Sequence, residues 1–439
     1  MELPPWASVV ALVLATVLFL RAVLRHRRRP KMNLPGPRPW PVIGNFNLLG
    51  TLPHRSLNAL SKQYGPLMRV HFGSFPVVVA SSVDMAKFFL KTHDVLFIDR
   101  PRMAAGKHTT YNYSNIGWCP YGAYWRQARK LCADELFSTR RIDSFEHVRG
   151  EEVHALLRGL HATAGQVVPV KERLSTMSLN IITRMVLGRK YVDKEGVAAY
   201  GGSVMALKEF SDLDLFLQEE RKVIRIGANN DLIAGGTESA AVIAEWAISE
   251  LLKNPETLAK ATEELDRVIG SDRWVTEKDI SHLPYLEAIV KETMRLHIVA
   301  PMLSPRLSRE AVSVNGYNIP AGTIVLVNVW AISHDPSLWD APEEFRPERF
   351  IGSKIDVKGH DFELLPFGSG RRMCPSYVLG LKVIQLSLAN LLHGFAWRLP
   401  VGMTKEELSM EEIFGLSTPR KFPLQAVVAP KLPAHLYTA

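Results

Sequence analysis

The chain has 439 residues, of which 47% are hydrophobic, so it is long enough to bury a large core. Its formal net charge is +9, but no nucleic-acid-binding motif accompanies that charge, which therefore favours a membrane or an acidic protein partner over nucleic acid. Its three cysteines form no Cys-x-x-Cys pair and no even-numbered set, which argues against a disulfide scaffold or a cysteine zinc site and fits a reducing, cytosol-facing compartment.

The N-terminus carries an apolar segment followed by a basic one. Residues 6–20 are uncharged and apolar, and a basic cluster occupies residues 25–31. A helix over residues 6–24 covers about 28 Å, close to the ~30 Å hydrocarbon core of a bilayer. A cleaved signal peptide, the alternative, carries its positive charge before the apolar run. We therefore predict a membrane anchor helix at residues 1–24, with the body of the protein in the cytosol by the positive-inside rule.

The segment after the anchor is stiff. Alternating prolines at residues 34–41 hold φ and remove backbone donors, so this stretch cannot be helical. We predict a basic, proline-rich hinge over residues 25–41 and one body over residues 42–439. In that body, residues 67–72 and 75–80 flank a Gly-Ser pair, which predicts a hairpin in a small peripheral sheet.

Apolar residues recur at helical spacing through most of the body. This spacing covers residues 83–91, 151–210, 232–248 and 377–397. Residues 100–124, rich in Gly, Tyr, Asn and Pro, are predicted to form a long loop. The sequence therefore predicts a mainly α-helical domain with small sheets.

Two short patterns on predicted helices each fit either an ordinary structural role or a functional one. Trp125 and Arg129 share one helix face at i, i+4, where an indole N–H and a guanidinium can meet the same anion; a solvated basic face is the alternative. Gly235 and Gly236 lie side by side in a helix at a cost of ~1 kcal/mol each, so either close packing or a functional distortion is expected there.

The stretch at residues 367–376 leads into the apolar segment 377–397 and contains Cys374. A cysteine just before a helix gains thiolate stabilisation from unpaired backbone N–H groups, and a thiolate ligand favours O–O cleavage at iron. Nearby glycines allow close backbone approach, and the neighbouring arginines suit the carboxylates of a macrocycle. A buried free cysteine in a glycine-containing loop is the alternative.

The pattern Phe367-x-x-Gly370-x-Arg372-x-Cys374 resembles the haem-binding loop of the cytochrome P450 family, the haem-thiolate monooxygenases. The resemblance implies that Cys374 ligates the iron of haem b. The family ends this loop with glycine two residues after the cysteine, where this chain has Ser376. If that position needs a positive φ, serine costs about 1 kcal/mol or more.

The same resemblance assigns roles to other residues. It implies that Trp125 and Arg129 bind a haem propionate, and that Glu238 and Ser239 relay protons to iron-bound oxygen, with serine standing where many members have threonine. It places an ion-pair network under the haem loop, formed by Glu292, Arg295 and Arg349. It also places pocket-lining segments at residues 298–303 and 415–418. In the predicted loop at residues 100–124, it suggests four candidates for substrate contact: Tyr111, Asn112, Tyr113 and Ile116.

Compared with the family, several dozen residues are absent near residues 217–223, including most of the helix pair that roofs the substrate pocket. A pocket without its roof exposes haem to water and loses apolar lining.

The hinge, the Pro-Glu-Arg-Phe segment and the haem loop are most similar to those of plant microsomal enzymes of specialised metabolism. The resemblance therefore implies a monooxygenase of the endoplasmic reticulum membrane. It would insert one oxygen atom from O2 into an apolar flavonoid, phenylpropanoid or terpenoid. Its electrons would come from NADPH through a flavoprotein reductase, drawn to a basic face that includes Arg371 and Arg372.

Two other functions are considered. One is a haem-thiolate isomerase or dehydratase that needs no reductase, against which the proton-relay pair argues. The other is a truncated, catalytically impaired membrane protein that binds haem without turnover, which the gap favours.

Overall fold

The computed structural model describes residues 32–110, 112–190 and 219–438, together with six isolated positions between residues 6 and 17. The predicted anchor at residues 1–24 and much of the predicted hinge therefore lie outside the described residues. Among the described residues, no helix combines the length and the apolar character needed to cross a membrane. The chain divides into two compact units.

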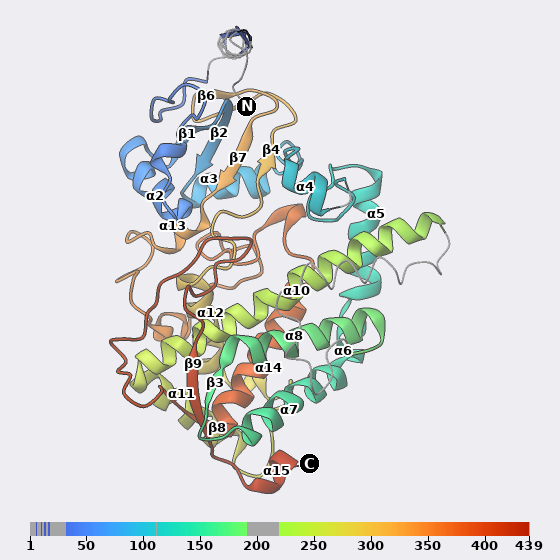
Figure 1. Cartoon of the computed structure of the whole chain (residues 1–439), viewed down its shortest axis with the longest axis vertical. Helices are drawn as coiled ribbons and strands as arrows, with labels where there is room; N and C mark the ends of the chain where they lie inside the picture. Colours follow the sequence, from blue (N-terminus) through green and yellow to red (C-terminus); the bar gives the residue numbers. More distant parts are fainter. Residues whose placement is uncertain are drawn as a thin grey trace. The chain divides into compact units, whose positions relative to one another are not determined.

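Unit 1 comprises residues up to Pro101 together with Pro305–Asn328, and it is built on a four-stranded sheet (Figure 1). The sheet order is β1-β2-β7-β4, with strands β1 (Leu67–Phe72), β2 (Phe75–Ala80), β7 (Ile324–Val327) and β4 (Arg306–Leu307). The predicted hairpin is confirmed: Leu67 pairs with Ala80 and Phe72 with Phe75 in antiparallel register. The parallel pairing of β2 with β7 joins two stretches far apart in sequence.

Short helices and a second hairpin complete unit 1. The helices are α2 (Pro53–Tyr64) and α3 (Val83–Lys87), and α3 continues into a π-helical turn, Phe88–Thr92. The hairpin joins β5 (Val312–Val314) to β6 (Tyr317–Ile319). The helix predicted at residues 83–91 is thus confirmed, although its second half is π-helical.

Unit 2 spans Arg102–Ser304 and the residues from Val329 onwards, and it is mainly helical, as predicted (Figure 1). Its longest helix is α10 (Glu219–Lys253), which packs against α8 (Val170–Leu187), α12 (Pro284–Leu296) and α14 (Tyr377–Gly394). The other helices are α4 (Ala104–Thr109), α5 (Ala123–Leu131), α6 (Thr139–Ser144), α7 (Glu146–Ala162), α11 (Pro255–Ile269), α13 (Val329–Ser333) and α15 (Ala434–Thr438). A sheet in the order β3-β9-β8 lies beside them, with strands β3 (Val167–Pro169), β9 (Gln425–Pro430) and β8 (Phe395–Arg398).

Three predicted segments differ from the structure. The loop at residues 100–124 contains α4, and the helical stretch beginning at 151 is interrupted by β3. The apolar helix predicted over 377–397 ends at Gly394, because Phe395 pairs with Pro430 of β9. A Cβ at Gly394 would lie 2.6 Å from the Trp274 ring, so the helix end is also packed too closely for a larger residue.

A buried ion-pair group ties α7 to α14. Glu277 accepts hydrogen bonds from Arg149 of α7, which is fully buried, and from Lys382 of α14 at 2.6 Å. Burial raises the pKa of the Glu277 carboxyl, but the hydrogen bonds from Arg149 and Lys382 outweigh that effect and hold the pKa below its ordinary value. The group therefore stabilises the fold while Glu277 is ionised.

Candidate haem and oxygen site

The loop around Cys374 is closed by backbone geometry. Gly368 and Gly370 adopt φ of +71° and +70°, a left-handed region that favours glycine. A Cβ added at Gly368 would meet Leu303 at an ordinary 3.7 Å, so the backbone conformation rather than crowding requires glycine there. The Cys374 N–H donates to the Phe367 carbonyl at 3.0 Å, which holds the thiol at the entrance to α14. Cys374 is half-buried, and Phe367 packs near Tyr377.

Ser376 is the residue at which this loop departs from the expected pattern. Its φ is −104°, so the strain expected for a serine at a left-handed position does not arise. The condition for that cost is therefore not met, because the position does not have positive φ in this chain. Serine fits the loop without a backbone penalty.

Beside the loop, α5 presents two polar groups without protein partners. Trp125 is 4% exposed, and its indole Nε1–H makes no hydrogen bond in the described part of the chain. The Arg129 guanidinium likewise makes no hydrogen bond or ion pair with a described residue. Burial lowers the pKa of Arg129, and the nearby thiol groups of Cys374 and Cys132 oppose that shift. The buried, unpaired Trp125 N–H costs about 1–3 kcal/mol, so it and the half-buried Arg129 guanidinium fit an anionic acceptor.

The two arginines of the loop point in different directions. Arg372 donates to the carbonyls of Ile116 at 3.1 Å and Cys119 at 2.7 Å, and its guanidinium lies 4.6 Å from the centre of the Trp125 ring. Arg372 is thus directed inward, and it positions Trp125. Arg371 is exposed, so of the two arginines only Arg371 lies on the open surface.

The two adjacent glycines of α10, Gly235 and Gly236, have different surroundings. A Cβ on Gly236 would lie 2.8 Å from Ile182 of α8, so close packing of the two helices requires glycine there. Gly235 is exposed, and an added Cβ would meet nothing within 4 Å. The helix is continuous through both residues, and close packing is the reason found for Gly236 alone.

Glu238 and Ser239 follow these glycines on α10. The Ser239 hydroxyl donates to the Gly235 carbonyl at 2.7 Å, and Glu238 lies 3.3 Å from the ammonium group of Lys171 on α8. The Glu238 side chain is 42% exposed, so its carboxylate has access to solvent. Lys171 is a partner that the sequence did not suggest, because it lies on another helix.

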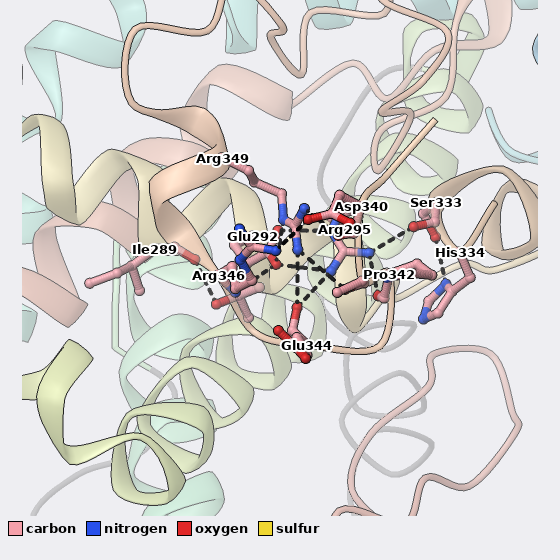
Figure 2. A network of polar contacts seen from close by, with 12 residues as sticks. Ile289, Glu292, Arg295, Ser333, His334, Asp340, Pro342, Glu344, Arg346 and Arg349 are labelled. Atoms are coloured by element: carbon pink, nitrogen blue, oxygen red, sulfur yellow. Dashed lines mark hydrogen bonds and ion pairs between the residues drawn. The ribbon is translucent and has the colours of Figure 1, made fainter. Parts of the chain in front are cut away.

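Glu292, Arg295 and Arg349 form the predicted ion-pair network, which Figure 2 shows. Glu292 and Arg295 are fully buried and joined by two hydrogen bonds, of 2.8 and 2.9 Å. Arg349 donates to Glu292 at 2.9 Å, and so does the backbone N–H of Arg346.

Arg295 also holds the backbone around it. It donates to carbonyls of Ser333, Pro342 and Glu344 at 2.8, 2.8 and 3.2 Å. Together with the two bonds to Glu292, these contacts use all five of its N–H donors. The network fixes the segments after α12 and α13 without touching the Cys374 loop directly.

The structure describes three of the four predicted substrate contacts in the 100–124 segment. Tyr111 lies outside the described residues. The Tyr113 hydroxyl donates to Met103 at 2.8 Å, and the Ile116 carbonyl accepts from Arg372. Asn112 and Tyr113 both have positive φ, of 55° and 62°.

A second buried polar cluster was missed at the sequence level. Trp246 of α10 stacks on His297 with 3.8 Å between ring centres, and His297 lies 2.7 Å from Glu250. The Arg420 guanidinium lies 5.2 Å from the Trp246 ring, and the indole N–H donates to the Thr418 carbonyl at 3.2 Å. The cluster draws on three stretches of chain that are far apart in sequence, so only the fold reveals it.

This cluster joins the two segments expected to line the pocket. Thr418 donates to the Val299 carbonyl at 3.2 Å, and the Leu424 N–H donates to Glu245 of α10 at 2.7 Å. Burial raises the pKa of the Glu245 carboxyl, while the Leu424 N–H lowers it. Residues 298–303 and 415–424 are therefore fastened to α10 and to each other.

A family model described as cytochrome P450 matches residues 34–218 and 227–424. The chain belongs to the cytochrome P450 family. Among similar proteins, it is 47% identical to a trimethyltridecatetraene synthase of Zea mays, over 98% of this chain and 95% of the relative. It is 45% identical to a dimethylnonatriene synthase of Zea mays over the full length of both chains, and 38% identical to a flavonoid 3'-monooxygenase of Petunia hybrida over 98% of this chain and 99% of the relative.

The fold comparison agrees with the family. A zebra fish cytochrome P450 in a structure with abiraterone superposes with a TM-score of 0.74 at 24% identity, covering 87% of this chain and 100% of that one. This likeness supports the P450 fold for the described chain.

The haem of the P450 family fits the residues present. The unpaired indole N–H of Trp125 and the Arg129 guanidinium supply the donors that a haem propionate needs, and both lie on α5 beside the Cys374 loop. Cys374 offers the thiolate that the family uses to ligate iron. The donor set thus matches haem b bound through Cys374.

The alignments contain positions that this chain lacks. The alignment with the first Zea mays relative runs over 525 positions, so at least 86 of them face a gap in this chain of 439 residues. The family match is broken at residues 219–226, which overlaps the predicted gap at 217–223.

Proposed function

We propose that this P450 is a monooxygenase of plant specialised metabolism that inserts one oxygen atom from O2 into an apolar substrate. The proposal includes electron supply from NADPH through a P450 reductase and an N-terminal anchor in the endoplasmic reticulum membrane, with the catalytic body facing the cytosol. The observation that carries it is the pair of unpaired donors on α5, the Trp125 N–H and Arg129, beside the Cys374 loop.

Bound haem supplies the iron chemistry by which one atom of O2 enters a substrate. The chain supplies the surroundings. Cys374 would provide the thiolate ligand, and a haem propionate would accept a hydrogen bond from Trp125 and pair with the Arg129 guanidinium. The ion pair with Lys171 orients the Glu238 carboxylate, which can exchange protons with solvent. The Ser239 hydroxyl both donates and accepts, so it can pass a proton between water and the haem side of α10.

The names of the relatives favour a branched, apolar substrate. Two of the similar enzymes are named for polyene hydrocarbons, and a third for a flavonoid. We therefore place terpenoids first, ahead of flavonoids and phenylpropanoids.

The N-terminal apolar run and the basic cluster after it support the membrane anchor. The exposed Arg371 and the net charge of +9 support docking of an acidic reductase. Turnover should therefore fall as ionic strength rises, because salt screens such encounters.

The test is the reduced carbon-monoxide difference spectrum of membranes that contain this protein, beside Cys374→Ala. The expected result is a Soret band at the position of thiolate-ligated haem that the variant lacks, followed by NADPH- and reductase-dependent oxygenation of terpenoid substrates. A protein that is present in the membrane without this band would refute the proposal.

The internal gap favours a second candidate, a catalytically impaired haem-binding membrane protein. At least 86 alignment positions have no counterpart in this chain. This candidate predicts the same thiolate band. It also predicts that NADPH consumption yields reduced oxygen species instead of product, because water would reach an open haem pocket. The ratio of product formed to NADPH consumed separates the two functions.

A further inference from the structure

The hydroxyl group of Ser376 is not used in the way its position suggests. Ser376 is the N-cap residue of α14, where serine ordinarily accepts a hydrogen bond from a backbone N–H of the first turn. No such capping bond is present. The backbone carbonyl of Ser376 accepts from Gly380 at 2.9 Å, so the helix begins normally without the side chain.

The hydroxyl is instead directed at sulfur. Ser376 Oγ lies 3.5 Å from Cys374 Sγ, a hydrogen-bond distance for an O–H and a sulfur atom. When Cys374 is a thiolate, it carries no proton, so only the serine can donate. The backbone N–H of Cys374 donates to the Phe367 carbonyl, so it does not point at the sulfur. The Ser376 hydroxyl is a separate donor, and it lies against the sulfur.

We propose that Ser376 donates a hydrogen bond to the ligating thiolate of Cys374 and thereby raises the reduction potential of the haem iron. This inference rests on the proposed function, because it needs haem bound through Cys374. Ser376 touches the ligand atom and not the substrate, so it is a positioning residue that acts through Cys374.

The direction of the change in reduction potential follows from charge. Reduction of the iron adds one negative charge to the iron–sulfur unit, and a donor at sulfur stabilises that added charge more than the oxidised state. A hydrogen bond to a charged group shifts an equilibrium by roughly ten- to a hundredfold, and only the part that differs between the ferrous and ferric states shifts the potential. Removing this hydrogen bond should therefore change the ferric-to-ferrous ratio about tenfold at a fixed solution potential, which is about 59 mV for a one-electron couple.

The experiment uses the full-length holoprotein in its membrane and compares three variants at one position. Ser376→Ala removes the hydroxyl, Ser376→Gly also introduces the residue usual in the family, and Ser376→Thr keeps the hydroxyl. Ser369→Ala is the matched control: Ser369 is a buried serine of the same loop, and its hydroxyl donates to the Gly359 carbonyl at 2.6 Å.

The measurements are the ferric/ferrous reduction potential by spectroelectrochemistry and the iron–sulfur stretching frequency by resonance Raman spectroscopy. We expect a more negative potential and a higher stretching frequency in the alanine and glycine variants. The threonine variant and Ser369→Ala should match the unmodified protein.

Unchanged potentials in Ser376→Ala and Ser376→Gly would overturn the inference while leaving the proposed function intact. An equal shift in Ser369→Ala would overturn it as well, because general loosening of the loop would then explain the effect. A protein without the thiolate band in its carbon-monoxide spectrum would overturn both proposals, since no ligating thiolate would exist.

Discussion

Replacing Glu292 by alanine removes an acceptor that receives four hydrogen bonds in a fully buried site. Arg295 then keeps a buried positive charge without its carboxylate, and two of its five donors lose their partner. Breaking a buried ion pair by removing one partner costs about 3–5 kcal/mol. Because domain stabilities are about 5–15 kcal/mol, Glu292→Ala should remove at least about a fifth of the stability, and all of it if the protein is only marginally stable.

The assay is urea unfolding followed by tryptophan fluorescence, read as the midpoint and slope of the transition. The matched control is Glu348→Ala. Glu348 lies in the same short turn as Arg349, and its ion pair with Lys260 is exposed, with side-chain exposures of 47% and 55%. An exposed pair contributes about 0–1 kcal/mol, so the control should stay near the unmodified protein. Equal losses in the two variants would refute the reasoning from burial.

Four further substitutions test individual contacts. Gly236→Ala should lower the melting temperature, because the new Cβ lies 2.8 Å from an isoleucine of α8. Gly235→Ala places its Cβ in open space, so it should raise stability by up to about 1 kcal/mol. Thermal unfolding that ranks the two variants in the opposite order would contradict this reasoning. Trp125→Phe should stabilise the apoprotein slightly, because it removes a buried unpaired N–H, yet weaken haem binding roughly tenfold in a haem titration. Glu277 has a folded-state pKa below its unfolded value near 4.5, so its stabilisation is full above that pH and is lost as the pH falls through the folded pKa. Glu277→Gln should therefore lose less stability than the unmodified protein on acidification from about pH 5 to about pH 3, and parallel losses would show that this carboxylate does not titrate as described.

The parts of the site that could be predicted are those held by neighbours in sequence. The spacing of Trp125 and Arg129 on one helix turn, the loop before Cys374, and the pairing of Glu292 with Arg295 each depend on a few consecutive residues. Local geometry fixes such contacts, so a sequence pattern can carry them.

The parts that escaped prediction depend on contacts between distant segments. The two adjacent glycines look equivalent in sequence, and only the approach of Ile182 to Gly236 separates them. The stack of Trp246, His297 and Arg420 joins three segments, none of which carries a signal alone. The end of α14 at Gly394 follows from pairing with β9, which overrides the helical pattern of the sequence.

The parallel pairing of β2 with β7 also bears on how the protein is made. The partner of Val77–Ala80 begins at Ile324, so the ribosome must add the 243 residues between Ala80 and Ile324 before the pairing can form. At about 5–20 residues per second, that takes roughly 12–50 s. During this interval the nascent hairpin presents an apolar strand edge, the kind of surface on which other chains can pair. The yield of soluble protein should therefore depend on translation speed and chaperone supply while the first half of the chain waits for the second.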